Sequence, residues 1–73
     1  MKYVYMFTDC GTPRDVAVFD SLDEAKQHGY KNYLVGMTTE EIASIGSELE
    51  WKEIEPNLYE HEDACPAYIV GVP

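Results

Sequence analysis

Residues Lys2 to Thr8 read KYVYMFT, a run of aromatic and β-branched side chains that predicts a β-strand. Because side chains alternate along a strand, its three aromatic residues would face one side of a sheet, and Val4 and Met6 the other. Both sides are apolar, which favours a position inside a sheet rather than at its edge. We therefore expect a neighbouring strand on each side.

Two other segments of the sequence are candidate neighbours of this strand. Asp9 to Pro13 (DCGTP) contains Gly11 and a proline and predicts a turn. Asp15 to Phe19 (DVAVF) then predicts a second strand that pairs with the first as a hairpin. At the far end of the chain, Ala67 to Val72 (AYIVGV) predicts another strand that is apolar on both sides.

Two capping signatures predict helices. Ser21 to Glu24 (SLDE) matches a capping box, and we expect the helix that follows to end at Gly29, a favoured C-terminal cap residue. Thr38 to Glu41 repeats the signature, and Gly46 would end this second helix. The stretch between them, Tyr30 to Met37 (YKNYLVGM), fits either a short buried strand or an extended crossing segment.

Glu50 to Glu55 and Leu58 to Glu62, joined by Pro56-Asn57, predict a β-hairpin. The length of 73 residues allows one domain, residues 1–73. The pattern predicts an α+β fold, a small antiparallel sheet of four or five strands with two short helices packed on one face. The expected order is roughly ββα(β)αβββ.

Acidic residues are concentrated in the predicted hairpin. Seven of the 14 Asp and Glu residues lie between Glu48 and Asp63, with Lys52 alone among them, and the formal net charge is −9. Phosphate binding needs clustered Lys or Arg, so direct binding to nucleic acid or to an anionic membrane is not expected. The expected partner is a basic protein surface, toward which the negative field would steer the chain.

The register of the hairpin sets which acids share a face. A two-residue turn at Pro56-Asn57 pairs Glu53 with Glu60. A three-residue loop would instead pair Glu53 with His61 and force Leu58 toward the left-handed region, so we favour the first register. One face would then carry Trp51, Glu53, Glu55, Leu58, Glu60 and Glu62, and the other Lys52, Ile54, Tyr59 and His61.

These rows of glutamates predict a non-enzymatic acidic protein-binding module. Alternate residues of a strand lie about 6.6–6.8 Å apart, close to the roughly 6.8 Å of two steps along one DNA strand. The glutamate face would act as a DNA mimic and occupy the basic groove of a nucleic-acid-acting protein. Trp51 would either contact the partner or lie under a helix. The expected partner-binding residues are Glu53, Glu55, Glu60, Glu62 and Trp51.

In size, charge and layout the chain is similar to the small acidic inhibitors that phages and mobile elements use against nucleic-acid enzymes of their hosts. The resemblance is one of type and rests on no alignable motif. It implies an inhibitor, or a host-defence antagonist, that acts in the cytoplasm. No apolar run approaches the roughly 18 residues of a membrane span, and two cysteines do not make a disulfide scaffold.

Three other interpretations remain open. The acid can serve solubility alone, or the chain can be a small accessory subunit that uses an apolar face or a sheet edge. A small metal-binding protein is the third. If partners on the first and last strands sum to 75, Tyr3 opposes Val72 and Cys10 meets Cys65, with His61 nearby. This spacing matches no standard metal motif, so we predict no catalytic residue, metal or cofactor.

Overall fold

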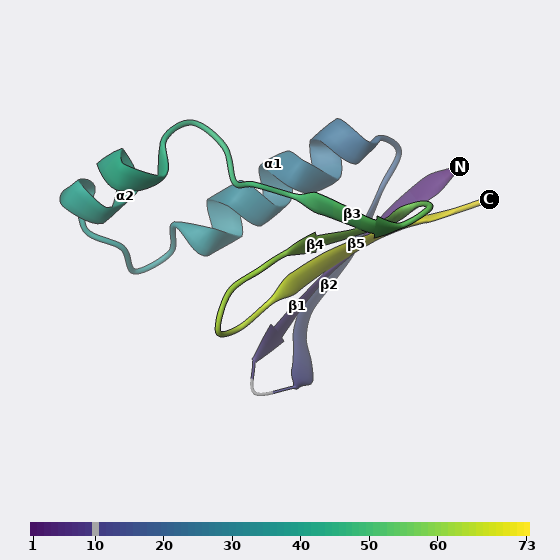
Figure 1. The fold of residues 1–73 in the computed structure, drawn as a ribbon, viewed down its shortest axis with the longest axis horizontal. Coiled ribbons are helices and arrows are strands. Elements are labelled where there is room, and N and C mark those ends of the chain that lie inside the picture. The colour runs from purple at the N-terminus through teal and green to yellow at the C-terminus, as the bar shows by residue number, and fades with distance from the viewer. Residues whose placement is uncertain (10) are drawn as a thin grey trace.

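A five-stranded antiparallel sheet with both helices on one side forms the molecule (Figure 1). The computed structural model describes residues 1–9 and 11–73. It confirms the predicted α+β class, and the strand order across the sheet is β2-β1-β5-β4-β3. In chain order the elements are β1 (Lys2–Asp9), β2 (Thr12–Phe19), α1 (Leu22–Tyr33), α2 (Thr39–Ile45), β3 (Lys52–Glu55), β4 (Leu58–His61) and β5 (Ala67–Val72).

β1 lies between β2 and β5, as its two apolar faces predict. Tyr5 of β1 is paired with Ala17 on one neighbour and Ile69 on the other. The side chains of Tyr5 and Ile69 are 1% and 0% exposed, and Ala25 of α1 packs with them. The hydrophobic core therefore lies between α1 and the side of the sheet that carries Tyr5.

α1 is longer than the sequence predicts. Ser21 caps its N-terminus, and its hydroxyl oxygen accepts a hydrogen bond from the Glu24 amide at 3.2 Å. The helix continues through Gly29 instead of ending there. A Cβ at this glycine would lie 3.0 Å from Trp51 Cζ2 and 3.0 Å from Tyr5 Cε2. Gly29 thus allows close packing against two rings, and the prediction of a cap is wrong.

The ambiguous segment 30–37 is neither a strand nor a crossing segment. Its first residues form the last turn of α1, and the Leu34 amide donates to the Tyr30 carbonyl oxygen at 3.2 Å. A turn follows, in which Gly36 has a φ of +81°. Val35, which a buried strand would enclose, is 79% exposed.

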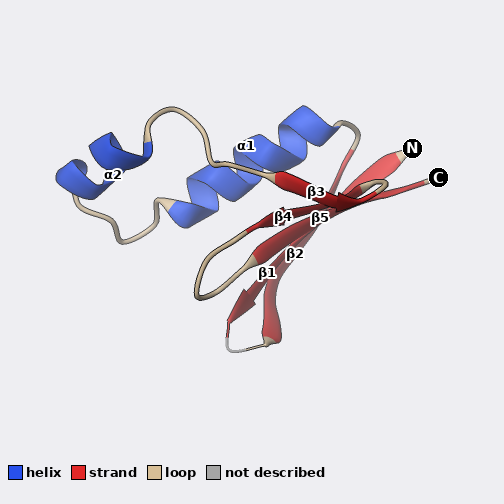
Figure 2. Cartoon of the chain, viewed as in Figure 1, coloured by secondary structure: helices blue, strands red, loops and turns tan. Residues whose placement is uncertain are grey.

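α2 has both hydrogen bonds of the predicted capping box. The Glu41 amide donates to Thr38 Oγ1 at 3.2 Å, and the Thr38 amide donates to Glu41 Oε1 at 3.1 Å. The helix ends at Gly46, as predicted. α2 extends beyond the sheet, at the far end of α1 (Figure 2). Its end is connected to α1 by a hydrogen bond from Tyr30 Oη to the Gly46 carbonyl oxygen at 2.7 Å.

The register between β1 and β5 differs by one residue from the one considered above. Tyr3 opposes Gly71, where a Cβ would lie 3.2 Å from Tyr3 Cε1, so the glycine leaves room for the tyrosine ring. Tyr68 consequently pairs with Met6 and faces away from α1, because a one-residue shift moves each side chain to the other face. The pairing of Cys10 lies outside the described residues.

Candidate protein-binding surface

The acidic hairpin forms with the predicted two-residue turn at Pro56-Asn57, in which Asn57 has a φ of +65°. Glu55 and Leu58 flank the turn and oppose each other. Beyond this pair the register shifts at Ile54, which is a β-bulge. Neither of the two registers considered from the sequence therefore continues along the whole hairpin.

The bulge changes which side chains face each other. Glu53 lies opposite Tyr59, and Lys52 lies opposite Glu60, so the predicted Glu53–Glu60 pair is wrong. Like charges directly opposite each other destabilise a sheet, whereas opposite charges stabilise it. The bulge removes the repulsion that an unbroken register would have placed at the centre of the hairpin.

Glu53 consequently lies on the side of the sheet that α1 covers. Its neighbour Tyr59 pairs with the buried Ile69 on β5, which fixes the side. The Glu53 carboxylate accepts a hydrogen bond from the Asn57 amide at 3.2 Å. Burial, and next the negative charge of Glu53, raise the pKa of Tyr59 above its ordinary value. The Glu53 carboxylate thus interacts with residues of its own hairpin, and it does not share a face with the other three glutamates.

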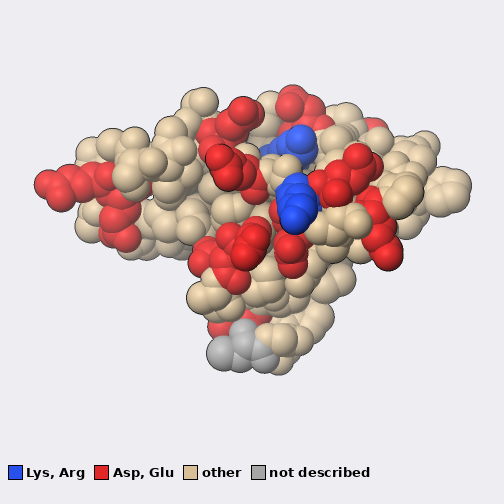
Figure 3. All heavy atoms as spheres, in the orientation of Figure 1, with Lys and Arg blue, Asp and Glu red and all other residues tan. Residues whose placement is uncertain are grey.

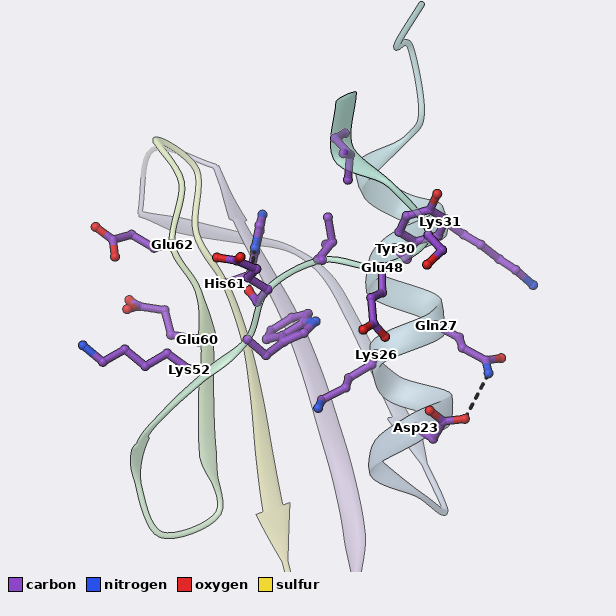
Figure 4. Close-up of a pocket in the computed structure, with 15 residues that line it drawn as sticks. Asp23, Lys26, Gln27, Tyr30, Lys31, Glu48, Lys52, Glu60, His61 and Glu62 are labelled. Carbon is purple, nitrogen blue, oxygen red and sulfur yellow. Dashed lines mark hydrogen bonds between the residues drawn. The ribbon is translucent and has the colours of Figure 1, made fainter. Parts of the chain in front are cut away.

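Three of the predicted glutamates lie on the opposite side, and Figure 4 shows Glu60, Glu62 and Lys52 projecting away from α1. Glu60 pairs with Tyr68, whose pKa is raised by burial and by a hydrogen bond to the Glu60 carboxylate. Glu55 shares this side with its partner Leu58. Glu55, Glu60 and Glu62 are called the acidic border below.

Trp51 is separated from the acidic border. It packs against the core, and Gly29 of α1 allows its ring to approach the helix closely. Of the two positions expected for Trp51, the structure shows the one under a helix. The five predicted partner-binding residues therefore do not share one face.

His61 connects the hairpin to the segment that precedes β3. Its Nδ1 atom donates to the Glu50 carbonyl oxygen at 3.1 Å, because a carbonyl can only accept. Its ring centroid lies 5.0 Å from that of Tyr33 and 5.8 Å from that of Trp51. Its Nε2 atom is buried and has no hydrogen-bond partner among the described residues. These contacts give His61 a structural role.

A cleft of about 1,080 Å³ lies between α1, the segment before β3 and the hairpin (Figure 4). Small-molecule sites are mostly apolar with a few polar groups. This cleft is lined instead by acidic and basic side chains together, among them Glu48, Glu50, Lys26 and Lys31. Its lining is typical of a solvated groove.

The carboxylates between residues 48 and 63 form no ion pair among the described residues. Among the described residues, ion pairs join Lys2 to Asp20 and Arg14 to Asp9, and His28 Nε2 contacts Asp15 Oδ2, all outside the hairpin. Figure 3 shows Asp and Glu gathered on the face where β3 lies, around a few Lys or Arg. Within the part of the chain that the structure describes, the carboxylates of the hairpin thus have no ion-pair partner within 4.0 Å, although Lys52 lies on the same side as the acidic border.

Sequence reasoning missed one further surface, the side of the sheet that faces away from α1. Val16 and Val18 of β2 are 57% and 61% exposed there. The alternation of β2 and the two apolar faces of β1 were signals of it. They did not show which face α1 would leave uncovered.

No group of three or more His, Cys, Asp or Glu side chains that could hold a metal ion forms among residues 1–9 and 11–73. Within the same residues, no helix has both the length and the apolar character needed to span a membrane. No protein-family model matches the chain, and no curated protein or solved structure was found to be similar to it.

Proposed function

We propose that the chain is a non-enzymatic protein-binding module that occupies a basic, nucleic-acid-binding groove of a partner protein and so inhibits the partner. The observation that carries the proposal is the acidic border, whose carboxylates have no ion-pair partner within 4.0 Å in the described part of the chain. A net charge of −9 adds long-range attraction to a cationic surface.

The bulge restricts how closely the surface resembles DNA. Glu53 faces the α1 side, so the four glutamates do not form two opposed rows. Glu55, Glu60 and Glu62 remain available to bind a basic groove. They do not, however, reproduce the two opposed rows of phosphates of a DNA duplex. The proposed setting is the cytoplasm, and the phage or mobile-element type of inhibitor remains the closest analogy in size and charge.

Catalysis has less support, because both histidines have structural contacts. His28 Nε2 lies 2.8 Å from Asp15 Oδ2, and its ring contacts those of Tyr5 and Phe19, with centroids 4.9 Å and 5.1 Å away. His61 donates to a backbone carbonyl. The exposed valines of β2 favour a second candidate function, an accessory subunit that associates through an apolar face.

The test is a parallel capture experiment from lysate at low salt. The bait proteins are the wild type, a Glu55→Gln/Glu60→Gln/Glu62→Gln variant, and a Glu24→Gln/Glu40→Gln control with two exposed acids replaced elsewhere. We expect basic nucleic-acid-acting proteins to be captured by the wild type and by the control. Removal of three exposed ion pairs, each worth roughly 0.2–1 kcal/mol, should weaken capture by the triple variant about tenfold.

Raised salt should elute these proteins, because exposed charges are screened over about 10 Å at 0.1 M ionic strength. Equal capture by the triple variant and the wild type would contradict the proposal. Salt-insensitive self-association of the chain would favour the accessory-subunit function instead.

A further inference from the structure

The side of the sheet that faces away from α1 is an ordered apolar surface. Its side chains form two rows that cross the strands, because residues directly opposite each other share a face. The pairs Val4–Val18 and Val4–Val70 begin the first row, and Met6–Val16 and Met6–Tyr68 begin the second. From β2 to β3 the complete rows are Val18, Val4, Val70, Leu58 and Glu55, and Val16, Met6, Tyr68, Glu60 and Lys52.

Neither helix covers these rows. α1 contacts β1, β2 and β5 on the side that holds the core, and α2 extends beyond the sheet (Figure 2). Val16 and Val18 are more than half exposed, and Val72 at the end of β5 is 36% exposed. A contiguous apolar surface of this kind on a small domain marks a site of interaction.

Charge indicates what covers this surface. Both rows are mainly apolar on β2, β1 and β5. The first row then ends at Glu55 on β3, and the second passes Glu60 on β4 before it ends at Lys52 on β3, so carboxylates outnumber the one lysine at this end of the rows. A second copy would bring another net charge of −9 against this border. A partner with apolar side chains beside Lys or Arg complements it instead.

The dimensions of the surface fit one α-helix. Strands β2, β1 and β5 span two interstrand spacings, about 10 Å in total, which is close to the width of a helix with its side chains. β1 has eight residues and is about 26 Å long, the length of a helix of roughly 18 residues. Helix positions i and i+4 are about 6 Å apart, near the roughly 6.7 Å expected between Glu60 and Glu62 in an extended chain.

We propose that an amphipathic, cationic helix of the partner protein docks along β1 on this open face. Its apolar side chains would contact the valine-rich rows, and its Lys or Arg side chains would lie against the acidic border. The inference rests on the proposed function and names the contact surface and the chemistry of the partner.

A designed peptide of about 18 leucine and lysine residues, with the leucines on one helical face, is the probe. This length exceeds the roughly 12–15 residues below which isolated helices are marginal. Its affinity is measured by fluorescence anisotropy at physiological salt. We expect the Val16→Thr/Val18→Thr variant to bind about tenfold more weakly, because threonine keeps the β-branched shape but is less apolar.

Val35→Thr is the matched control, since Val35 is 79% exposed but lies in the turn after α1. It should bind as the wild type does. Glu60→Gln/Glu62→Gln should also bind about tenfold more weakly, whereas a peptide with glutamate in place of lysine should not bind. Circular dichroism verifies that each variant is folded.

Equal affinity of the valine variant and the wild type would overturn docking on this face. If the glutamate variant alone lost affinity, the proposed function would stand without this surface. A wild-type dimer in light scattering that the valine variant abolishes would show that a second copy covers the face, and would also overturn the inference.

Discussion

The two faces of the sheet are made from the same kind of side chain, yet only one of them is covered. On one face, Tyr5 and Ile69 are almost fully enclosed under α1. On the other, Val16 and Val18 of an edge strand are mostly exposed. The comparison shows that apolar character alone does not identify the core of a small domain, because α1 can cover only one side.

The faces also differ in charge. The acidic border adjoins the open face, while Glu53 alone of the four predicted glutamates turns to the covered one. The bulge at Ile54 produces this division, since it changes the register within the four residues of β3. An open face that is apolar and bordered by acid is suited to binding, and the covered face to stability.

The largest expected effect is the difference in stability between a substitution on the covered face and one on the open face. Ile69→Ala should lower the free energy of unfolding by about 2–5 kcal/mol, because it opens a cavity in the core. Val18→Ala, on the open face, should change it by less than about 0.5 kcal/mol. Urea unfolding followed by circular dichroism measures both.

A chain of this size buries only about 60% of its unfolded surface, so Ile69→Ala can unfold a substantial fraction of the molecules without denaturant. Similar losses in the two variants would mean that the open face is also enclosed, and would contradict the comparison.

A smaller effect tests the contact between α1 and the covered face. Gly29→Ala should destabilise the protein by about 1–3 kcal/mol, since the new Cβ would meet Trp51 and Tyr5 at 3.0 Å. An unconstrained glycine inside a helix would give the opposite result, a gain of about 0.5–1 kcal/mol. Thermal unfolding, with exposed Lys31→Ala as the control on the same helix, distinguishes the two. A stabilised Gly29→Ala variant would rule out the close packing.

Local signals in the sequence predicted much of the fold. The two N-terminal caps at Ser21 and Thr38, and the end of α2 at Gly46, depend on neighbouring residues and were found where the sequence places them. The inner position of β1 followed from its two apolar faces. Gly29 shows the limit of such signals, because the glycine is explained by Trp51 and Tyr5, rings distant in the sequence.

The positions of the site residues depended on register, which the sequence did not determine. β1 and β5 are apolar on both sides, so a shift of one residue leaves the pattern acceptable while it moves Tyr68 to the open face. The bulge at Ile54 likewise moved Glu53 away from Glu60. In the hairpin, one residue of register thus separated an array of four glutamates from an acidic border of three.

The smallest expected effect is in tyrosine titration, and it tests which face each glutamate occupies. Burial raises the pKa of Tyr5, Tyr59 and Tyr68 in the folded protein above the ordinary value of about 10. The stability that these groups contribute is therefore complete below about pH 10. It is lost as the pH rises through the raised folded-state values, so we expect the urea midpoint to fall in that range.

Single substitutions then assign each glutamate to its tyrosine. Glu53→Gln should lower the pKa of Tyr59 and leave that of Tyr68 unchanged, because the two glutamates are on opposite faces. Glu60→Gln should lower the pKa of Tyr68 alone. NMR titration of the tyrosine rings measures both values, with Glu40→Gln on α2 as the control. Had the unbroken register formed, Glu53 would share a face with Glu60 and Tyr68, and Tyr59 would lie on the other face. A Glu53→Gln variant that shifts the pKa of Tyr68 and leaves that of Tyr59 unchanged would therefore support that register against the bulge.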